Sequence, residues 1–68
     1  MVLREWRYYQ GKDGSVRQVL HIPVPPETDF WYAKSGERLS KSKIVECTLE
    51  EFNTWAQYEV TPDWRRVY

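Results

Sequence analysis

Two stretches near the N-terminus alternate between apolar and polar residues, as strands with one buried face do. Residues 2–10 and 15–24 are rich in β-branched and aromatic side chains, and a glycine-containing segment, residues 11–14, separates them. This pattern predicts a β-hairpin. Both strands carry most of their apolar residues at even positions, and a three-residue loop, residues 12–14, is the length that pairs even positions with even.

The register of this hairpin predicts which of its faces is buried. It places Trp6 opposite Leu20. Further along the hairpin, Tyr8 lies opposite Gln18, and Gly14 occupies the left-handed position of a type I turn followed by a bulge. We therefore expect the even-numbered face to form the core. The odd-numbered face then carries rings and cations outward: Arg7, Tyr9, Arg17 and His21.

Prolines end the hairpin and begin a connector. Pro23, Pro25 and Pro26 lack amide donors, so strand pairing should stop near residue 23. An extended connector is expected from there to about residue 29. The spacing of these prolines also fits a PxxP ligand, although a short proline run between strands is more often only a connector.

A second, shorter hairpin is predicted in the middle of the chain. Residues 30–34 indicate a third strand and Ser35-Gly36 a turn, followed by a polar fourth strand or loop at residues 37–42. The charged residues 41–43 would protect an open sheet edge from pairing with other chains. Residues 44–45 return the chain to the core.

The clearest local signal is a helix start at Thr48. Thr48 can cap the helix and Glu51, three residues later, completes a capping box. Cys47 and Phe52 have the spacing of a hydrophobic staple. The helix should cover residues 49–57. Its apolar stripe, at the spacing of a helix lying on a sheet, consists of Leu49, Phe52, Trp55 and Ala56.

The last residues allow two structures. Thr61-Pro62-Asp63 could cap a second short helix with proline in its first turn, or it could form a turn into a final strand at residues 64–68. We favour the strand. The chain as a whole then predicts one small α+β domain, residues 1–68, in which an antiparallel sheet of four to five strands packs one face against the helix.

Aromatic side chains are the main packing material of this small domain. The 68 residues include four Trp, five Tyr and two Phe, and each ring can bury roughly 150–250 Å². We expect Trp6, Phe52 and Trp55 in the core. For four other rings, core and interface positions stay equally open: Tyr9, Trp31, Trp64 and Tyr68.

The charges argue against a dedicated polyanion binder. Ten Lys and Arg balance ten Asp and Glu, so no net field draws the protein to nucleic acid or anionic lipid. A basic segment, residues 34–43, adjoins an acidic one, residues 46–63. Such segments are ordinarily two solvated surfaces of opposite sign.

A single cysteine and a charged N-terminus bear on localisation. Cys47 has no partner for an internal disulfide, and one cysteine cannot form a cysteine-based zinc site. The N-terminal residues lack the apolar run of a signal peptide, and no stretch reaches the ~20 apolar residues of a membrane span. We expect a small soluble protein of the cytoplasm.

Catalytic chemistry is not indicated. His21 is the only histidine, and it neighbours no plausible nucleophile in the predicted fold. The carboxylates at the helix start and in the first turn have structural roles. Because no glycine-rich phosphate loop and no cluster of metal ligands is present either, we expect no enzyme, no cofactor and no metal.

Protein binding is the function that the residue types favour. Trp, Tyr and Arg are the residues most enriched at interface hot spots. We expect a non-catalytic protein-binding module that uses an aromatic and arginine-bearing sheet face. The partner-binding residues predicted are Arg7, Tyr9, Arg17, His21, Trp31, Lys34, Trp64 and Tyr68.

Two alternatives use the same face. One is a module for RNA or single-stranded nucleic acid, with the basic segment 34–43 contacting phosphates. The other is a homodimer with a structural role, in which a second copy covers the rings. In size and composition alone, the chain resembles accessory or inhibitor proteins of phages and mobile elements, many of which occupy a host protein.

Overall fold

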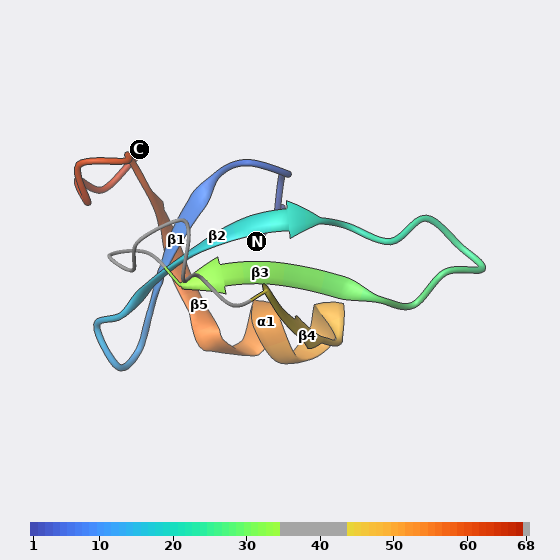
Figure 1. The fold of residues 1–68 in the computed structure, drawn as a ribbon. Coiled ribbons are helices and arrows are strands. Elements are labelled where there is room, and N and C mark those ends of the chain that lie inside the picture. Colours follow the sequence, from blue (N-terminus) through green and yellow to red (C-terminus); the bar gives the residue numbers. More distant parts are fainter. Residues whose placement is uncertain (35–43, 68) are drawn as a thin grey trace.

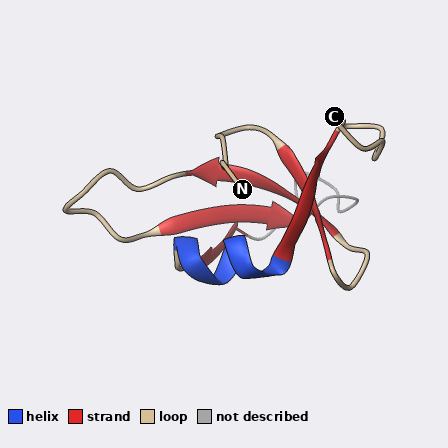
Figure 2. Cartoon of the chain, turned by 180° about the vertical axis from the view of Figure 1, so that it is seen from behind, coloured by secondary structure: helices blue, strands red, loops and turns tan. Residues whose placement is uncertain are grey.

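A computed structural model describes residues 1–34 and 44–67 of the chain. Within these residues the elements, in chain order, are β1 (Tyr8–Gly11), β2 (Val16–His21), β3 (Phe30–Lys34), β4 (Ile44–Cys47), α1 (Leu49–Trp55) and β5 (Ala56–Val60). Neighbouring strands are antiparallel and lie in the order β4-β3-β2-β1-β5. The helix lies along one side of this sheet (Figures 1 and 2). The predicted α+β class, a small antiparallel sheet with one helix on one face, is confirmed.

The register of the first hairpin is as predicted. Tyr8 pairs with Gln18 across β1 and β2. The loop has the predicted length, because the amide of Gly14 donates to the Gly11 carbonyl over 3.0 Å and the amide of Gly11 donates to the Ser15 carbonyl over 3.0 Å. Gly14 has a φ of 82°, the left-handed conformation that this turn requires.

The prediction that the even-numbered face forms the core is wrong. Tyr9, an odd-numbered residue, is 0% exposed and packs edge-on against Phe52 of the helix, with ring centroids 6.0 Å apart. Val19, on the same face of β2, is also fully buried. Trp6, which we expected in the core, is 66% exposed.

A bulge at Trp6 accounts for the exposure of this residue. The amide of Trp6 donates to the Val19 carbonyl (2.7 Å), and the amide of Val19 donates to the Arg7 carbonyl (3.0 Å). Two residues therefore lie opposite one, which interrupts the alternation of the N-terminal segment. Trp6 has a φ of 70° at this point. The predicted strand at residues 2–10 consequently shortens to β1, and the even-numbered pattern before the bulge does not continue along it.

The core between the sheet and α1 is a cluster of rings around Phe52. The ring centroid of Phe52 lies 4.8 Å from that of Phe30, 5.4 Å from Tyr32 and 5.2 Å from Trp55. Aromatic pairs at such distances contribute about 0.5–1.5 kcal/mol each beyond their buried area. The prediction that Phe52 is a core residue is confirmed, and Trp55 is half-buried against the cluster.

The middle of the chain is confirmed where the structure describes it. The predicted third strand, residues 30–34, is β3. The predicted turn and polar segment at residues 35–42, and the charged edge at 41–43, lie outside the described residues. Where the chain is described again, β4 pairs with β3, and Val45 packs against the core while Ile44 is 62% exposed.

The helix begins as predicted and ends earlier. The Thr48 hydroxyl accepts a hydrogen bond from the Glu51 amide over 3.1 Å, as an N-cap does. The helix stops at Trp55 because Ala56 is already extended and pairs with Gly11 of β1. Leu49 departs from the predicted apolar stripe, since it is exposed at the first helical position.

The last strand lies earlier than predicted. It is β5, which follows α1 directly and pairs with β1. Thr61 then begins a tight turn that folds the chain back along β5, with an isolated bridge between Val60 and Arg66. This bridge is the only strand-like pairing within the described part of residues 64–68.

Candidate functional site

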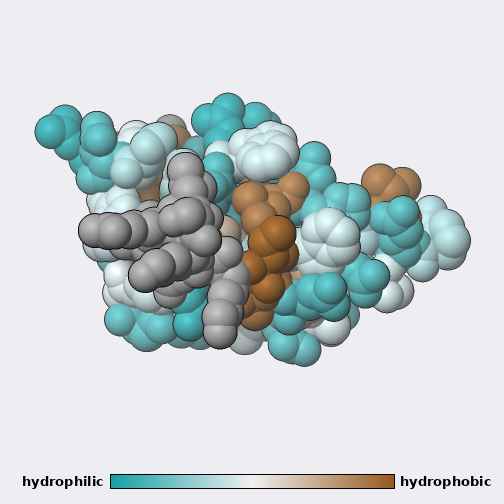
Figure 3. Space-filling view, in the orientation of Figure 1, coloured by the Kyte–Doolittle hydropathy of each residue, from teal (hydrophilic) through white to brown (hydrophobic). Residues whose placement is uncertain are grey.

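The sheet face opposite α1 is the candidate site, and we call it the outer face. Strand alternation separates it from the buried residues of the helix side, such as Tyr9 and Tyr32. Figure 3 shows a compact group of strongly apolar side chains on the surface, bordered by pale aromatic and by hydrophilic side chains. By strand pairing, the outer face carries Tyr8, Gln10, Val16, Gln18, His21, Trp31, Ala33, Ile44, Glu46, Tyr58 and Val60. Val16 and Val60 are buried, so the exposed apolar surface of this face lies on the β3 and β4 side.

A pair of tilted rings, the His21–Trp31 pair, lies on the outer face. His21 and Trp31 pair across β2 and β3, and their ring centroids are 5.1 Å apart. Two carboxylates hold the imidazole. Its Nδ1 lies 3.6 Å from Glu5 Oε2, and its Nε2 lies 3.2 Å from Glu27 Oε2. Trp31 is 37% exposed, so part of its indole surface faces solvent.

The His21–Trp31 pair depends on a second irregularity of the sheet. The pairing of β2 with β3 shifts between Val19 and His21, which leaves Leu20 as an extra residue in β2. This shift brings the odd-numbered His21 to the outer face, although the odd-numbered Val19 points to the helix. Ile22, in turn, packs against the core cluster.

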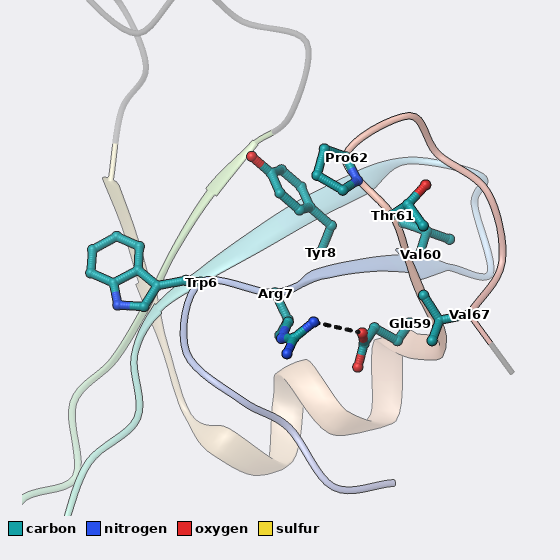
Figure 4. A pocket seen from close by; sticks show the side chains of 8 residues that line it. All are labelled: Trp6, Arg7, Tyr8, Glu59, Val60, Thr61, Pro62 and Val67. Carbon is teal, nitrogen blue, oxygen red and sulfur yellow. Dashed lines mark ion pairs between the residues drawn. The ribbon is translucent and has the colours of Figure 1, made fainter.

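A pocket of about 260 Å³ lies at the β1–β5 end of the sheet (Figure 4). Tyr8 and Pro62 project to one side of the strands, whereas Arg7 and Glu59 project to the other and form an ion pair of 3.8 Å. The indole of Trp6 points away from the other lining side chains. The lining residues are Trp6, Arg7, Tyr8, Glu59, Val60, Thr61, Pro62 and Val67.

Polar contacts fix the aromatic side chains beside this pocket. The Tyr58 hydroxyl donates to Gln10 Oε1 over 2.9 Å, across β5 and β1. The Arg66 guanidinium lies over the Tyr58 ring, 4.6 Å from its centroid. Rings held in this way lose little further conformational freedom on binding, which favours them as interface residues.

Several predicted partner-binding residues lie on the helix side of the sheet, among them Tyr9 and Arg17. Tyr9 is buried, its hydroxyl accepts a hydrogen bond from the Arg4 amide (2.8 Å), and burial raises its pKa. The Arg17 guanidinium is enclosed by two rings, 3.9 Å from Trp55 and 4.6 Å from Tyr32. Their predicted placement on an outer face is therefore wrong, because that placement assumed that the even-numbered face was the core.

The other predicted residues are dispersed. His21 and Trp31 come together on the outer face, and Arg7 lies at the pocket with Glu59. Lys34 is exposed at the end of β3. Trp64 is half-exposed in the C-terminal turn. Tyr68 lies outside the described residues.

Sequence reasoning missed Trp6 and Ile44 as surface residues. Both fit strands by residue type, and Trp6 also matched the even-numbered apolar pattern. Trp6 is exposed at a bulge. The position of this bulge depends on backbone hydrogen bonds rather than on residue type, so the sequence carried no signal for it. Ile44 is exposed because it begins an edge strand and pairs with Ala33 on the outer face.

The thiol of Cys47 is not activated. Burial and the nearby Glu51 carboxylate raise its pKa, whereas a nucleophilic cysteine needs a lowered pKa. Cys47 packs against the core cluster beside the helix start. It therefore behaves as a small apolar residue.

Comparisons with known proteins leave function to be argued from the surface of the molecule. No protein-family model matches the sequence, and no curated protein or solved structure is significantly similar to it. In residues 1–34 and 44–67, no group of three or more His, Cys, Asp or Glu is placed to hold a metal ion. Across the same residues, no helix has the length and apolar character needed to cross a bilayer.

Proposed function

We propose that this chain is a non-catalytic protein-binding module that binds its partner through the outer face. The observation that carries the proposal is the exposure of large apolar side chains there and at the adjoining pocket. Trp6 is 66% exposed, Ile44 62% and Trp31 37%. A small domain has few apolar residues to spare from its core, so surface tryptophans of this kind favour an interface.

The polar surroundings also suit a protein partner. On the outer face, the apolar side chain of Trp31 is bordered by the imidazole of His21 and by the carboxylates of Glu5 and Glu27 that lie close to it. Interfaces between proteins commonly combine an apolar centre with such a polar rim. We further propose that the protein acts in the cytoplasm as a small accessory or inhibitor protein, of the phage or mobile-element type, that occupies a host protein.

Binding of nucleic acid through the outer face has less support. That alternative relied on rings interleaved with cations on one sheet face. Tyr9 and Arg17, two members of that set, lie on the helix side. On the outer face, His21 is close to the carboxylates of Glu5 and Glu27, which would repel a phosphate backbone.

Affinity capture with matched variants tests the proposal. Trp31→Ser removes an outer-face ring and leaves the backbone pairing of β3 in place. It should reduce capture of the partner at least tenfold, as loss of a hot-spot tryptophan does. Val24→Ser is the control, because Val24 is 70% exposed on the β2–β3 connection rather than on the outer face. Equal capture by the two variants, both folded by circular dichroism, would remove the outer face as the binding surface.

Two solution measurements separate the alternatives. Salt-dependent binding of labelled oligonucleotides would support nucleic acid as the target, and no binding at low salt would exclude it. Sedimentation at several protein concentrations tests the homodimer. A monomer at all concentrations would exclude strong self-association, whereas a dimer that Trp31→Ser dissociates would make a second copy the partner.

A further inference from the structure

A second groove lies away from the outer face, between the β2–β3 connection and the start of α1. Its volume is about 390 Å³. Figure 1 shows that the connection projects beyond the sheet at the end of the molecule where α1 begins. The residues that line the groove are Pro23, Pro25, Glu27, Thr28, Thr48, Leu49 and Glu50.

The groove combines apolar walls with carboxylates. Pro23 and Pro25 come from the connection, and Leu49, exposed at the first helical position, comes from α1. Glu27 lies on one wall and Glu50 on the other. An apolar groove with carboxylates on both sides fits a chain segment that carries aliphatic residues next to positive charge.

Both walls keep a defined position. In the connection, the Glu27 amide donates to the Val24 carbonyl over 2.9 Å, and Glu27 Oε2 lies 3.2 Å from His21 Nε2. On the other side, the Thr48 cap fixes the first turn of α1. A groove with such positioned walls requires little ordering when a segment binds, which lowers the cost of association.

The charge of the groove is one-sided. Its lining residues include two carboxylates and no Lys or Arg. Asp29 and Glu51 directly follow the lining residues Thr28 and Glu50 and are also acidic. An anionic ligand would be repelled here, whereas a cationic segment would be attracted to the groove and oriented by it.

We propose that this groove binds a peptide segment of a partner protein in which aliphatic side chains alternate with lysine or arginine. The aliphatic side chains contact the two prolines and Leu49, and the cations pair with Glu27 and Glu50. The groove shares Glu27 with the outer face through His21, whereas the two prolines, Leu49 and Glu50 belong to the groove alone, so one molecule can present two surfaces. Each exposed ion pair contributes little to affinity, so specificity requires the apolar and the charged contacts together.

Titration of the isotope-labelled protein with synthetic peptides tests this proposal. The probe is a short peptide of alternating leucine and lysine, and its matched control replaces every lysine by glutamate. NMR amide shifts at Thr28, Leu49 and Glu50 should respond to the lysine peptide at low salt and not to the glutamate peptide. Equal response to both peptides, or no response at these amides, would overturn the proposal.

Variants separate the groove from general charge attraction. Glu50→Gln should weaken the lysine peptide roughly 2- to 5-fold, the range for an exposed ion pair. Asp63→Asn makes the same change in net charge in the C-terminal turn, which follows the end of β5 that is farther from α1. It should weaken binding of the lysine peptide less than twofold. Equal loss in both variants would show attraction by net charge alone and contradict the groove.

Two further variants complete the test. Leu49→Ser keeps the charges and should also lower affinity for the lysine peptide at least twofold, because it removes apolar contact. Trp31→Ser should leave peptide affinity unchanged. Loss of peptide binding in Trp31→Ser would place the peptide on the outer face instead, so the two surfaces can fail separately.

Discussion

Two tight turns of the molecule share a backbone geometry and differ in the residue that the geometry constrains most. In the first, the Gly14 amide donates to the Gly11 carbonyl (3.0 Å) and φ of Gly14 is 82°. In the second, the Trp64 amide donates to the Thr61 carbonyl (2.8 Å) and φ of Trp64 is 67°. Glycine adopts this conformation without strain, whereas a bulky residue does so at a cost of about 1 kcal/mol.

The remaining bonds of the two turns also correspond. Gly11 donates its amide to the Ser15 carbonyl, as Thr61 does to the Arg65 carbonyl (2.7 Å). Hydrogen bonds and strand pairing therefore define this turn, and glycine is only the residue that adopts it with the least strain. A half-exposed tryptophan in this strained conformation indicates that its side chain has a role in structure or binding that glycine could not fill.

The largest expected effect comes from Gly11→Ala, which tests how the first turn is packed. A Cβ at Gly11 would overlap the indole of Trp55, so the ring or the strand must move. We expect a loss of about 3 kcal/mol in the free energy of unfolding, measured by denaturant titration. The loss should fall by more than half when Trp55→Leu is already present. If Gly11→Ala costs less than about 0.5 kcal/mol in the protein that keeps Trp55, this packing is contradicted.

The second effect compares the two left-handed positions directly. At position 14 a Cβ meets no atom within 4 Å, so Gly14→Ala should cost about 1 kcal/mol through backbone conformation alone. At position 64, Trp64→Gly and Trp64→Ala both remove the ring, and the glycine variant should be the more stable by the same amount. Chemical denaturation of all three variants measures this. Equal stability of the two position-64 variants would contradict the left-handed turn at that site.

The smallest effect concerns acid stability of the first turn. Hydrogen bonds from the Ser15 hydroxyl (2.7 Å) and amide (3.1 Å), and from Trp55 Nε1 (3.1 Å), lower the pKa of Asp13. The ionised carboxylate therefore stabilises the folded state above the ordinary carboxyl range, and this contribution is lost as the pH falls through the lowered pKa.

Thermal unfolding at neutral pH and at about pH 3 measures this contribution. Asp13→Asn should show a smaller acid-induced drop in midpoint than the wild type. Ser15→Ala, which removes one donor and keeps the carboxylate, should fall between them. An identical drop in all three proteins would show that Asp13 does not couple protonation to folding.

The turn length and the residue composition predicted the hairpin register but not its buried face. Lys12, Asp13 and Gly14 determine the loop, and the loop determines pairing. The face depended instead on where the ring cluster around Phe52 forms, which brings together β3 and α1 from distant parts of the chain. Two bulges, at Trp6 and at Leu20, further broke the alternation on which the prediction rested.

In the helix, too, the feature set by local contacts was predictable and the feature set by distant contacts was not. Its start was predictable because Thr48 and Glu51 interact locally. Its end was not, because Ala56 leaves the helix to pair with Gly11, which is far away in the sequence. At the candidate site, the sequence left core and surface positions open for Trp31, and the structure places it on the outer face. The exposure of Trp6 was not predictable, because it follows from a tertiary hydrogen bond to Val19.

A photocrosslinking comparison tests most directly whether the outer face binds a protein. A photoreactive phenylalanine analogue replaces Trp31 in one sample and Asn53, exposed on α1, in another. We expect one partner to be crosslinked from position 31 in cell extract, and not from position 53. Crosslinking of that partner from position 53 alone would contradict the assignment of the outer face as the binding surface.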